Sequence, residues 1–350
     1  MIGKDPRTLT WESPFPIVKS SMSELRKDPT RGHWVLVRPA GQAPPATDEC
    51  PFCPGNESKT PPEIVAYRKD GSSPDGPGWS VRVVPEIDPY FLVESKVGRE
   101  GVGLYDKVPP RGATELIVES PDHHITPAGM DESRWEQVLW MYRDRLRDLK
   151  KDSAIRDILI MRRYKKPGSH ISHPYSRVVA VPVIFDDVRR QLIQSREYFE
   201  YKRRCVFCDI IRQEMADEVR VIRLTRHFVA LAPYAARSPY EAWILPRQHA
   251  CAYEQALTPD AAADLATLLR GHFKTLALMP GDPSFEMVLY TAPNQAAKLL
   301  PGEWSSIAED YHWHIEITPS PDRLSRIGGI HVNDLPPEEA VRRLRDAWNS

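Results

Sequence analysis

The sequence predicts an α+β fold built from two similar halves with antiparallel sheets. Three observations favour this fold: the same landmarks recur in the same order in both parts of the chain, short alternating or β-branched runs are numerous, and each part holds one long amphipathic helical pattern. Because the series of landmarks restarts near the middle of the chain, we expect one half over residues 1–195 and the other over residues 196–350.

The landmarks of the repeat follow one another in a fixed order. Each half has a Cys-x-x-Cys pair, CPFC at Cys50 and Cys53 and CVFC at Cys205 and Cys208. An alternating strand that ends in proline follows, WSVRVVP in the first half and HFVALAP in the second. A further strand then leads to histidine, in TELIVESPDHH and EAWILPRQHA, and a last histidine motif, HPY or HWH, completes each series. This parallel order indicates an ancient duplication.

Other strands and helices are predicted from periodicity. The strand-like runs are HWVLVRP, EIVAYRK, RDILIMRR, FEMVLYT and HWHIEIT. Residues 131–150 have the apolar spacing of a helix, a second helix begins at Thr258 and Pro259, and a third follows LPPEE near the end. The side chains that these helices are expected to bury are Trp135, Val138, Leu139, Tyr142, Leu146 and Leu149; Leu265, Leu268, Leu269 and Leu276; and Val341, Leu344 and Trp348.

Length and charge limit the class of protein. At 350 residues, with a hydrophobic fraction of 41%, the chain can form about two domains with sizeable cores. The net charge of -1 argues against a protein that chiefly coats nucleic acid or an anionic membrane. No apolar run reaches about 18 residues, and the first residues lack the apolar part of a secretion signal. We therefore expect a cytoplasmic protein without a membrane span.

The cysteines and histidines predict two metal sites. Four of the five cysteines form the two Cys-x-x-Cys pairs, and each pair has two downstream histidines at comparable positions of the repeat. Closed sets of two thiolates and two imidazoles are typical of structural Zn²⁺, whose binding free energy contributes to folding. The expected ligands are Cys50, Cys53, His123 and His173, with His124 as the alternative to His123, and Cys205, Cys208, His249 and His312.

A simpler interpretation of these residues is also open. The cysteines could be small core side chains and the histidines surface residues, with no metal between them. The fifth cysteine, Cys251, is expected to be a buried or half-buried free thiol, because a disulfide framework is uncommon in a cytosolic chain.

The order of the motifs resembles one known family. Cys-x-x-Cys, SPDH, HPY, a second Cys-x-x-Cys, LPRQH and YHWHIEITP follow one another as in the galactose-1-phosphate uridylyltransferase family of the histidine-triad superfamily. CPFCPGNESKTPPEI, GVGLYD and YHWHIEI are similar to the ADP-glucose phosphorylase-like branch of that family. The resemblance covers nearly the whole chain. It implies tandem histidine-triad halves packed as a pseudo-dimer, structural metals at the eight positions named above, and a nucleotide sugar or sugar phosphate as ligand. It also allows for a homodimer, since family members commonly dimerise.

The resemblance also identifies two candidate catalytic residues. In this family the second histidine of His-x-His-x-Gln attacks a nucleotide sugar and forms a nucleotidyl-histidine intermediate, while the glutamine contacts phosphate. The corresponding stretch here is His173-Pro174-Tyr175-Ser176-Arg177, so Tyr175 stands at the position of the nucleophile and Arg177 at that of the glutamine.

Further positions that are expected to contact substrate differ from the family as well. The loop of an Asn-x-Phe/Tyr-Pro motif reads Glu86-Ile87-Asp88-Pro89 here, and the F-x-N strand reads MRRY at residues 161–164. His314 is the counterpart of Tyr175 in the second half, where Glu316 could orient it by hydrogen bonding. The candidate substrate-binding residues are Arg31, Arg38, Glu86, Asp88, Ser169, His314 and Glu316.

Tyr175 leaves three interpretations open. A tyrosine side chain has a pKa of about 10 in free solution, so it is a much weaker nucleophile than histidine at neutral pH. The protein could bind its ligand without covalent catalysis, as a binding or regulatory paralogue. It could instead be a transferase, phosphorylase or hydrolase in which phosphate or water attacks directly while Arg177 clamps the phosphate. In the third interpretation Tyr175 is itself the nucleophile. Whether the protein is an enzyme therefore stays open.

Overall fold

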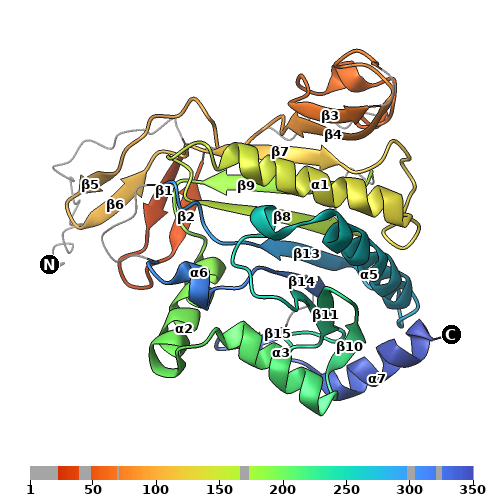
Figure 1. Ribbon diagram of the computed structural model, residues 1–350. Coiled ribbons are helices and arrows are strands. Elements are labelled where there is room, and N and C mark those ends of the chain that lie inside the picture. Colours follow the sequence, from red (N-terminus) through yellow and green to blue (C-terminus); the bar gives the residue numbers. More distant parts are fainter. Residues whose placement is uncertain are drawn as a thin grey trace, which may run out of the picture.

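The computed structural model describes residues 23–38, 49–68, 71–165, 173–297, 304–320 and 325–349. Its centre is one large antiparallel sheet, which spans the molecule in Figure 1. From edge to edge its strands are β10 (Val221–Leu224), β11 (Phe228–Leu231), β12 (Ala242–Pro246), β14 (His314–Pro319), β13 (Phe285–Tyr290), β8 (Asp157–Tyr164), β9 (Tyr175–Val181), β7 (Ala113–Val118), β4 (Trp79–Pro85) and β3 (Val65–Arg68). The predicted α+β class with antiparallel sheets is therefore confirmed.

The strand order is the same from either edge of the sheet. Strands β3, β4, β7, β9 and β8 of the first half correspond to β10, β11, β12, β14 and β13 of the second. The two halves meet where β8 pairs with β13, for example Ile160 with Leu289. This arrangement agrees with the predicted duplication. The expected boundary at residue 195 falls inside helix α2 (Asp186–Lys202), so the division of the chain at that residue stays a prediction.

Two long helices cover one face of the sheet and lie against each other, α1 (Glu132–Leu149) and α5 (Pro259–Ala277) (Figure 1). The side chain of Asp131 caps α1 by accepting a hydrogen bond from the Arg134 amide at 2.7 Å, and Thr258 caps α5 through the Ala261 amide at 3.3 Å. The apolar residues predicted for both helices are buried in one continuous core. Short helix α4 (Tyr253–Ala256) contacts α1, and α7 (Pro337–Trp348) packs against α5 and β10.

The other face is covered by elements that, with one exception, the sequence patterns did not predict. They are α2, α3 (Val206–Asp217), α6 (Ile307–Asp310) and a small sheet of β2 (Trp34–Val37), β1 (Glu24–Lys27), β6 (Tyr105–Val108) and β5 (Glu100–Val102). Of these, only β2 corresponds to a predicted run. A turn of 3-10 helix, η1 (Glu57–Lys59), and a separate hairpin of β15 (Ser325–Ile327) and β16 (Ile330–Val332) complete the described elements.

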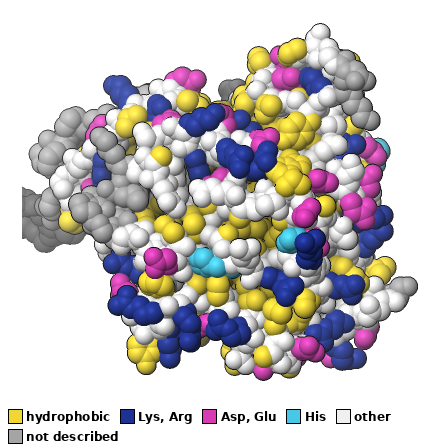
Figure 2. Space-filling view, in the orientation of Figure 1, with side chains coloured by type: hydrophobic (Ala, Val, Ile, Leu, Met, Phe, Trp, Pro, Cys, Tyr) yellow, Lys and Arg dark blue, Asp and Glu magenta, His cyan; other side chains and the backbone are white. Residues whose placement is uncertain are grey.

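Charged side chains of both signs are interspersed over the face shown in Figure 2, with hydrophobic patches between them. This mixture matches the near balance of 47 Lys and Arg against 48 Asp and Glu in the whole chain. None of the described helices has both the length and the apolar character needed to cross a bilayer.

Candidate metal centres and candidate active face

The first predicted ligand set converges at one end of the first half. The ligand atoms of Cys50, Cys53, His123 and His173 all lie within 4.8 Å of one another. Sγ of Cys53 is 3.3 Å from Nδ1 of His123, and Sγ of Cys50 is 3.7 Å from Nδ1 of His173. Nε2 of His173 lies 2.7 Å from the carbonyl oxygen of Ser120, a contact in which the ring N–H donates and leaves Nδ1 for a metal.

The structure also distinguishes between the two neighbouring histidines after β7. His123 belongs to the converging group, whereas the backbone amide of His124 donates to the Asp122 carboxylate at 3.0 Å and its ring packs edge-on against that of His123. The pKa of Cys53 is raised to about 11, mainly because the thiol is buried and to a smaller extent because Cys50 lies next to it. A bound cation would reverse this effect, because a coordinating thiol is held as thiolate.

The second predicted set has the same arrangement in the second half. The ligand atoms of Cys205, Cys208, His249 and His312 also lie within 4.8 Å of one another. Sγ of Cys208 is 3.3 Å from Nδ1 of His249 and 3.6 Å from Nδ1 of His312. The pKa of Cys208 is lowered to about 3, mainly by its hydrogen bond with Cys205 and to a smaller extent by those with the two histidines. This low pKa favours the thiolate form that binds a metal ion.

Both histidines of this second set keep one ring nitrogen for a metal. Nε2 of His249 lies 2.9 Å from the carbonyl oxygen of Ala308, and Nε2 of His312 lies 3.0 Å from that of Pro246. Two thiolates and two imidazoles form a donor set that suits Zn²⁺. Cys251, the remaining cysteine, is a half-buried free thiol as predicted.

Tyr175 and Arg177 lie on one face of β9, because side chains two residues apart on a strand point the same way. The Tyr175 ring packs edge-on against Phe52, with ring centres 5.8 Å apart. Arg177 forms an ion pair with Glu86, whose Oε1 is 2.6 Å from the Arg177 guanidinium. The face that carries the candidate catalytic residues is therefore bordered by an aromatic ring and by one of the candidate substrate-binding carboxylates.

Two further candidates join Arg177 and Glu86 in a charge cluster. Arg38 forms an ion pair with Asp88, and its guanidinium lies 5.0 Å from the centre of the Tyr90 ring. The pKa of Glu86 is raised, mainly because its carboxyl group is buried. The neighbouring Arg177 lowers this pKa and the neighbouring Asp88 raises it, but burial outweighs the effect of Arg177. The structure thus brings together Arg38, Glu86, Asp88, Tyr175 and Arg177, and we call these five residues the active-face cluster.

A buried polar network below the active-face cluster was not foreseen from the sequence. Ser176, which points to the opposite face of β9, donates a hydrogen bond of 2.5 Å to Glu119, and Arg162 donates one of 2.7 Å to the same carboxylate. Tyr142 of α1 also donates to Glu119, at 3.2 Å. Because Glu119 is fully buried and accepts all three, the network fixes the start of β9 against α1.

Arg163 is a second residue that the sequence did not indicate. In the antiparallel pairing of β8 with β9, Arg162 lies opposite Ser176. The next residue of β8, Arg163, therefore lies opposite the preceding residue of β9, Tyr175. Its Nε is 2.5 Å from Oε1 of Glu286. The departure of residues 161–164 from the family pattern could have drawn attention to this position.

The other candidates lie outside the active-face cluster. Arg31 is exposed in the turn between β1 and β2, where its amide donates to Asp28. His314 is fully buried in the second half and stacks on Tyr290, with ring centres 5.1 Å apart. Glu316 is 2.6 Å from the Arg237 guanidinium. Ser169 lies outside the described residues. A substrate-binding role for these four residues stays a prediction.

Comparison with known proteins gives full-length relatives. No protein-family model matches the chain. It is 27% identical over 352 residues to ADP-glucose phosphorylase of Arabidopsis thaliana, which covers 94% of each chain. It is 27% identical over 339 residues to galactose-1-phosphate uridylyltransferase of Thermotoga maritima, which covers 93% of this chain and 98% of the relative.

Solved structures agree with these relatives. A uridylyltransferase structure superposes with a TM-score of 0.77 at 27% identity and covers 93% of this chain and 98% of the other. An Arabidopsis thaliana ADP-glucose phosphorylase with bound ADP-glucose gives a TM-score of 0.70 at 28% identity and covers 93% and 99% of the two chains. The similarity therefore extends along both halves of the fold.

Proposed function

We propose that this chain, which is similar along nearly its whole length to galactose-1-phosphate uridylyltransferases and to ADP-glucose phosphorylase, binds a nucleotide sugar or a sugar phosphate at the active-face cluster. The names of the relatives and the bound ADP-glucose of one of them support this class of ligand. The position of Tyr175 at the start of β9 supports binding without the nucleotidyl-histidine intermediate of the family.

One observation carries the proposal. Nε of Arg177 and Oε2 of Glu86 are both buried, and neither has a hydrogen-bond partner among the described residues. Leaving such atoms unpaired costs about 1–3 kcal/mol each. A ligand that supplies an acceptor for Arg177 and a donor for Glu86 would satisfy both atoms. A phosphate oxygen next to a ribose or hexose hydroxyl offers this combination.

A second candidate function is transfer by direct displacement, which the position of Arg177 favours. Its side chain is 26% exposed, so it can hold a phosphate while another group attacks. In this reaction the oxygen of an acceptor phosphate or of water forms a bond to the phosphorus that carries the nucleoside. The bond from that phosphorus to the sugar phosphate breaks, and the sugar phosphate leaves with the electron pair.

A third candidate makes the Tyr175 oxygen the attacking group. The phenol loses its proton to solvent, its oxygen forms a bond to the phosphorus that carries the nucleoside, and the sugar phosphate leaves with the electron pair, so that a nucleotidyl-tyrosine stays on the protein. The packing of the Tyr175 ring on Phe52 holds it at the edge of the cluster, next to Arg177 on the same face. Such an adduct would add the mass of a nucleoside monophosphate to the chain, and this makes the third candidate separable from the second.

The two Cys₂His₂ groups are proposed to hold Zn²⁺ in structural roles. Each group offers four protein donors, so a bound ion would have no open position for substrate. Zinc in these sites would connect the segments that precede β9 and β14 to the Cys-x-x-Cys turns, and would not act on the ligand itself.

The test combines binding with product analysis. The full chain is titrated with ADP-glucose and UDP-glucose in a calorimeter, and the same mixtures are analysed by intact mass and for released sugar phosphate. We expect binding that weakens at least about tenfold in Arg177→Gln, the size expected when a charge-assisted hydrogen bond is lost. Arg270→Gln, which breaks an ion pair with Glu132 on the opposite face of the sheet, serves as the matched control.

The outcomes separate the three candidates. A mass adduct that is absent in Tyr175→Phe identifies Tyr175 as the nucleophile. Product without an adduct identifies direct displacement, and binding without either leaves the binding function. If neither nucleotide sugar binds the folded chain, or if Arg177→Gln binds as well as the wild type, the proposal is wrong.

A further inference from the structure

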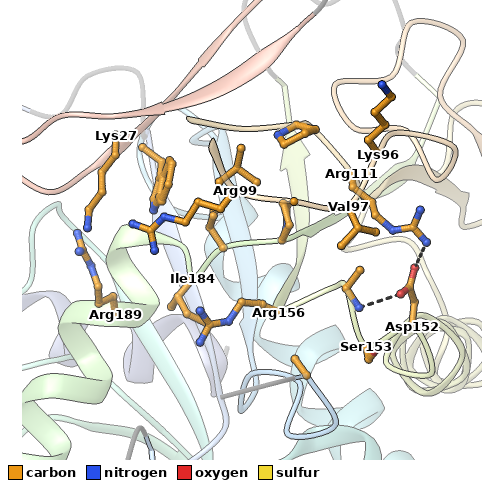
Figure 3. A pocket seen from close by; sticks show the side chains of 18 of the residues that line it. Lys27, Lys96, Val97, Arg99, Arg111, Asp152, Ser153, Arg156, Ile184 and Arg189 are labelled. Carbon is orange, nitrogen blue, oxygen red and sulfur yellow. Dashed lines mark hydrogen bonds and ion pairs between the residues drawn. The ribbon is translucent and has the colours of Figure 1, made fainter. Parts of the chain in front are cut away.

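A cavity lies at the opposite end of β9 from the active-face cluster. It has a volume of about 650 Å³, within the range of small-molecule sites. Its walls come from the small sheet, the loop between α1 and β8, the segment that follows β9, and α2 (Figure 3). Arg177 and Val181, the last residue of β9 and the neighbour of the lining residue Pro182, are roughly 13 Å apart along the strand, at a rise of about 3.3 Å per residue. We call this cavity the basic pocket.

A hydrophobic cluster separates the basic pocket from the active-face cluster. Phe91 and Val108 pack there on Val179 and Val181 of β9, and all four side chains are buried. Val179 and Val181 lie on the same face of β9 as Arg177, between Arg177 and the end of the strand nearest the basic pocket. A ligand in the basic pocket would therefore occupy a site of its own.

The lining of the basic pocket is strongly cationic. Six basic side chains and one carboxylate, Asp152, border it. The basic residues are Lys27, Lys96, Arg99, Arg111, Arg156 and Arg189. Arg111 has a structural task, since it holds Asp152 at 2.8 Å and the carbonyl oxygen of Val93 at 2.7 Å. Arg99 has one carboxylate partner, Asp106 at 2.5 Å, which is not among the lining residues. This excess of positive charge within one cavity favours an anionic ligand.

Two of these cations face each other. In Figure 3 the side chains of Lys27, from β1, and Arg189, from α2, point toward one another. Arg189 has one carboxylate partner on its own helix, Asp186 at 2.8 Å, whereas no carboxylate of the described residues lies within ion-pair distance of Lys27. Like charges that face each other repel, and an anion between them converts this repulsion into attraction.

Aromatic and aliphatic walls lie next to these charges. Trp34, Ile184 and Trp304 line the basic pocket. The Lys27 ammonium lies 6.0 Å and the Arg99 guanidinium 5.9 Å from the centre of the Trp34 ring. A ligand with both an anionic group and a flat or apolar part would use both kinds of wall.

We propose that the basic pocket binds a phosphorylated small molecule, with its phosphate between Lys27, Arg99 and Arg189 and its remaining part against Trp34. Guanidinium groups match phosphate oxygens in geometry and charge, and the lysine adds a third cation. The phosphate could belong to a nucleotide or be free inorganic phosphate, so the test includes both sources. The site is separate from the proposed function of the active-face cluster and does not depend on it.

The experiment measures binding of inorganic phosphate, pyrophosphate and ADP to the full chain by titration calorimetry. We expect ADP to bind more tightly than inorganic phosphate, because Trp34 can contact its ring system. Lys27→Ala and Arg189→Ala should each weaken binding about tenfold or more. A preference for inorganic phosphate over ADP would identify free phosphate as the source.

Neighbouring residues provide matched controls. Arg26 precedes Lys27 on β1 and pairs with Glu24, and Arg190 follows Arg189 on α2 and pairs with Asp187, so each control is a cation on the same element that lies outside the pocket. Arg26→Ala and Arg190→Ala should bind as the wild type does. Thermal unfolding of each variant verifies that the fold is kept.

Three results would overturn the proposal. The first is that no probe binds the folded wild type at millimolar concentration. The second is an equal loss of binding in the control variants, which would indicate general attraction of anions to the surface. The third is that binding of every probe is lost in Arg177→Gln but kept in Lys27→Ala and Arg189→Ala, which would place the ligand at the active-face cluster.

Discussion

Asp157 is a buried carboxyl group at the first position of β8. It accepts hydrogen bonds from the backbone amides of Ile158 and Phe185, each at 3.0 Å. Burial nevertheless outweighs these hydrogen bonds and raises its pKa to about 7. Since the ordinary pKa is 3.8, the folded chain retains a proton that the unfolded chain has already released at moderately acidic pH.

The sign of the resulting pH dependence follows from this difference. Between pH 3.8 and about 7 the folded state binds more protons than the unfolded state, so Asp157 contributes stability below this range and loses it as pH rises through it. We expect Asp157→Asn to flatten this part of the profile, measured as the free energy of urea unfolding at several pH values. Asp346→Asn, at an exposed position of α7, should keep the wild-type slope. Equal slopes in wild type and Asp157→Asn would refute the assignment.

The sequence predicted single residues best where a local motif determines their chemistry. Each Cys-x-x-Cys turn places two sulfur atoms close together, and the repeated histidines supply the other donors, so both ligand sets could be named. The ion pair of Arg177 with Glu86 joins positions far apart in the chain, and no local pattern predicts such a pairing. The same holds for Glu119, whose burial beneath Ser176 depends on how α1 lies on the sheet.

Among the elements, α1 and α5 could be predicted because their apolar stripes face one continuous core. Helix α2 could not, since only Val188, Leu192 and Ser195 are buried in a segment otherwise rich in charge. Its position depends on the second, smaller core that it forms with α6 on the other face of the sheet. Strands β1, β5 and β6 are short, and β5 is exposed throughout, so their alternation is too weak to recognise.

The contact between α5 and α7 gives a prediction at this scale. A Cβ atom on Gly271 would lie 2.4 Å from the Trp348 ring, so Gly271→Ala must displace Trp348 or α7. Alanine is the better helix former by about 1 kcal/mol, yet we expect a net loss of roughly 1–3 kcal/mol of unfolding free energy from the clash. Chemical denaturation of the single and double variants with Trp348→Ala measures it. In the Trp348→Ala background Gly271→Ala should become neutral or stabilising; an unchanged penalty there would exclude the clash as its cause.

The two Cys₂His₂ groups connect elements and give a second prediction. Cys208→Ser removes one donor of the second set, and we expect the zinc content of the purified chain to fall from about two ions to about one. The midpoint of thermal unfolding should fall as well, because binding to the folded state contributes stability. Elemental analysis and calorimetric scans measure both quantities. Cys251→Ser, at the free thiol, is the control and should keep both ions. A wild-type chain that is fully folded without metal would contradict a structural role.

At the scale of the whole molecule, the sequence predicted the duplication but not how the two halves join. Matching motifs reveal that two units are related, while the register of β8 against β13 depends on side chains from both units. Those strands have apolar residues on both faces, as expected for the centre of a sheet that is covered on both sides. Whether two chains associate as a homodimer stays a prediction of the family resemblance.

The shared sheet predicts that the halves do not fold separately. A chain ending after α2 would expose β8 as an unpaired apolar edge, and such edges promote aggregation. We expect residues 1–202 and 203–350 to be insoluble or aggregated when produced alone, and to form a soluble one-to-one complex when produced together. Size-exclusion chromatography with light scattering distinguishes these states. Two monomeric, cooperatively unfolding fragments would show that the halves are independent domains.

The central position of the β8–β13 pair has a consequence for how the molecule opens to solvent. Amide hydrogens at the edges of a sheet exchange through local fraying, whereas those in the middle exchange only through larger openings. Here the middle of the sheet is the junction between the two duplicated units. The slowest-exchanging amides should therefore lie at this junction and not in the interior of either unit. The place where the two similar halves meet would be the last part of the protein to come apart.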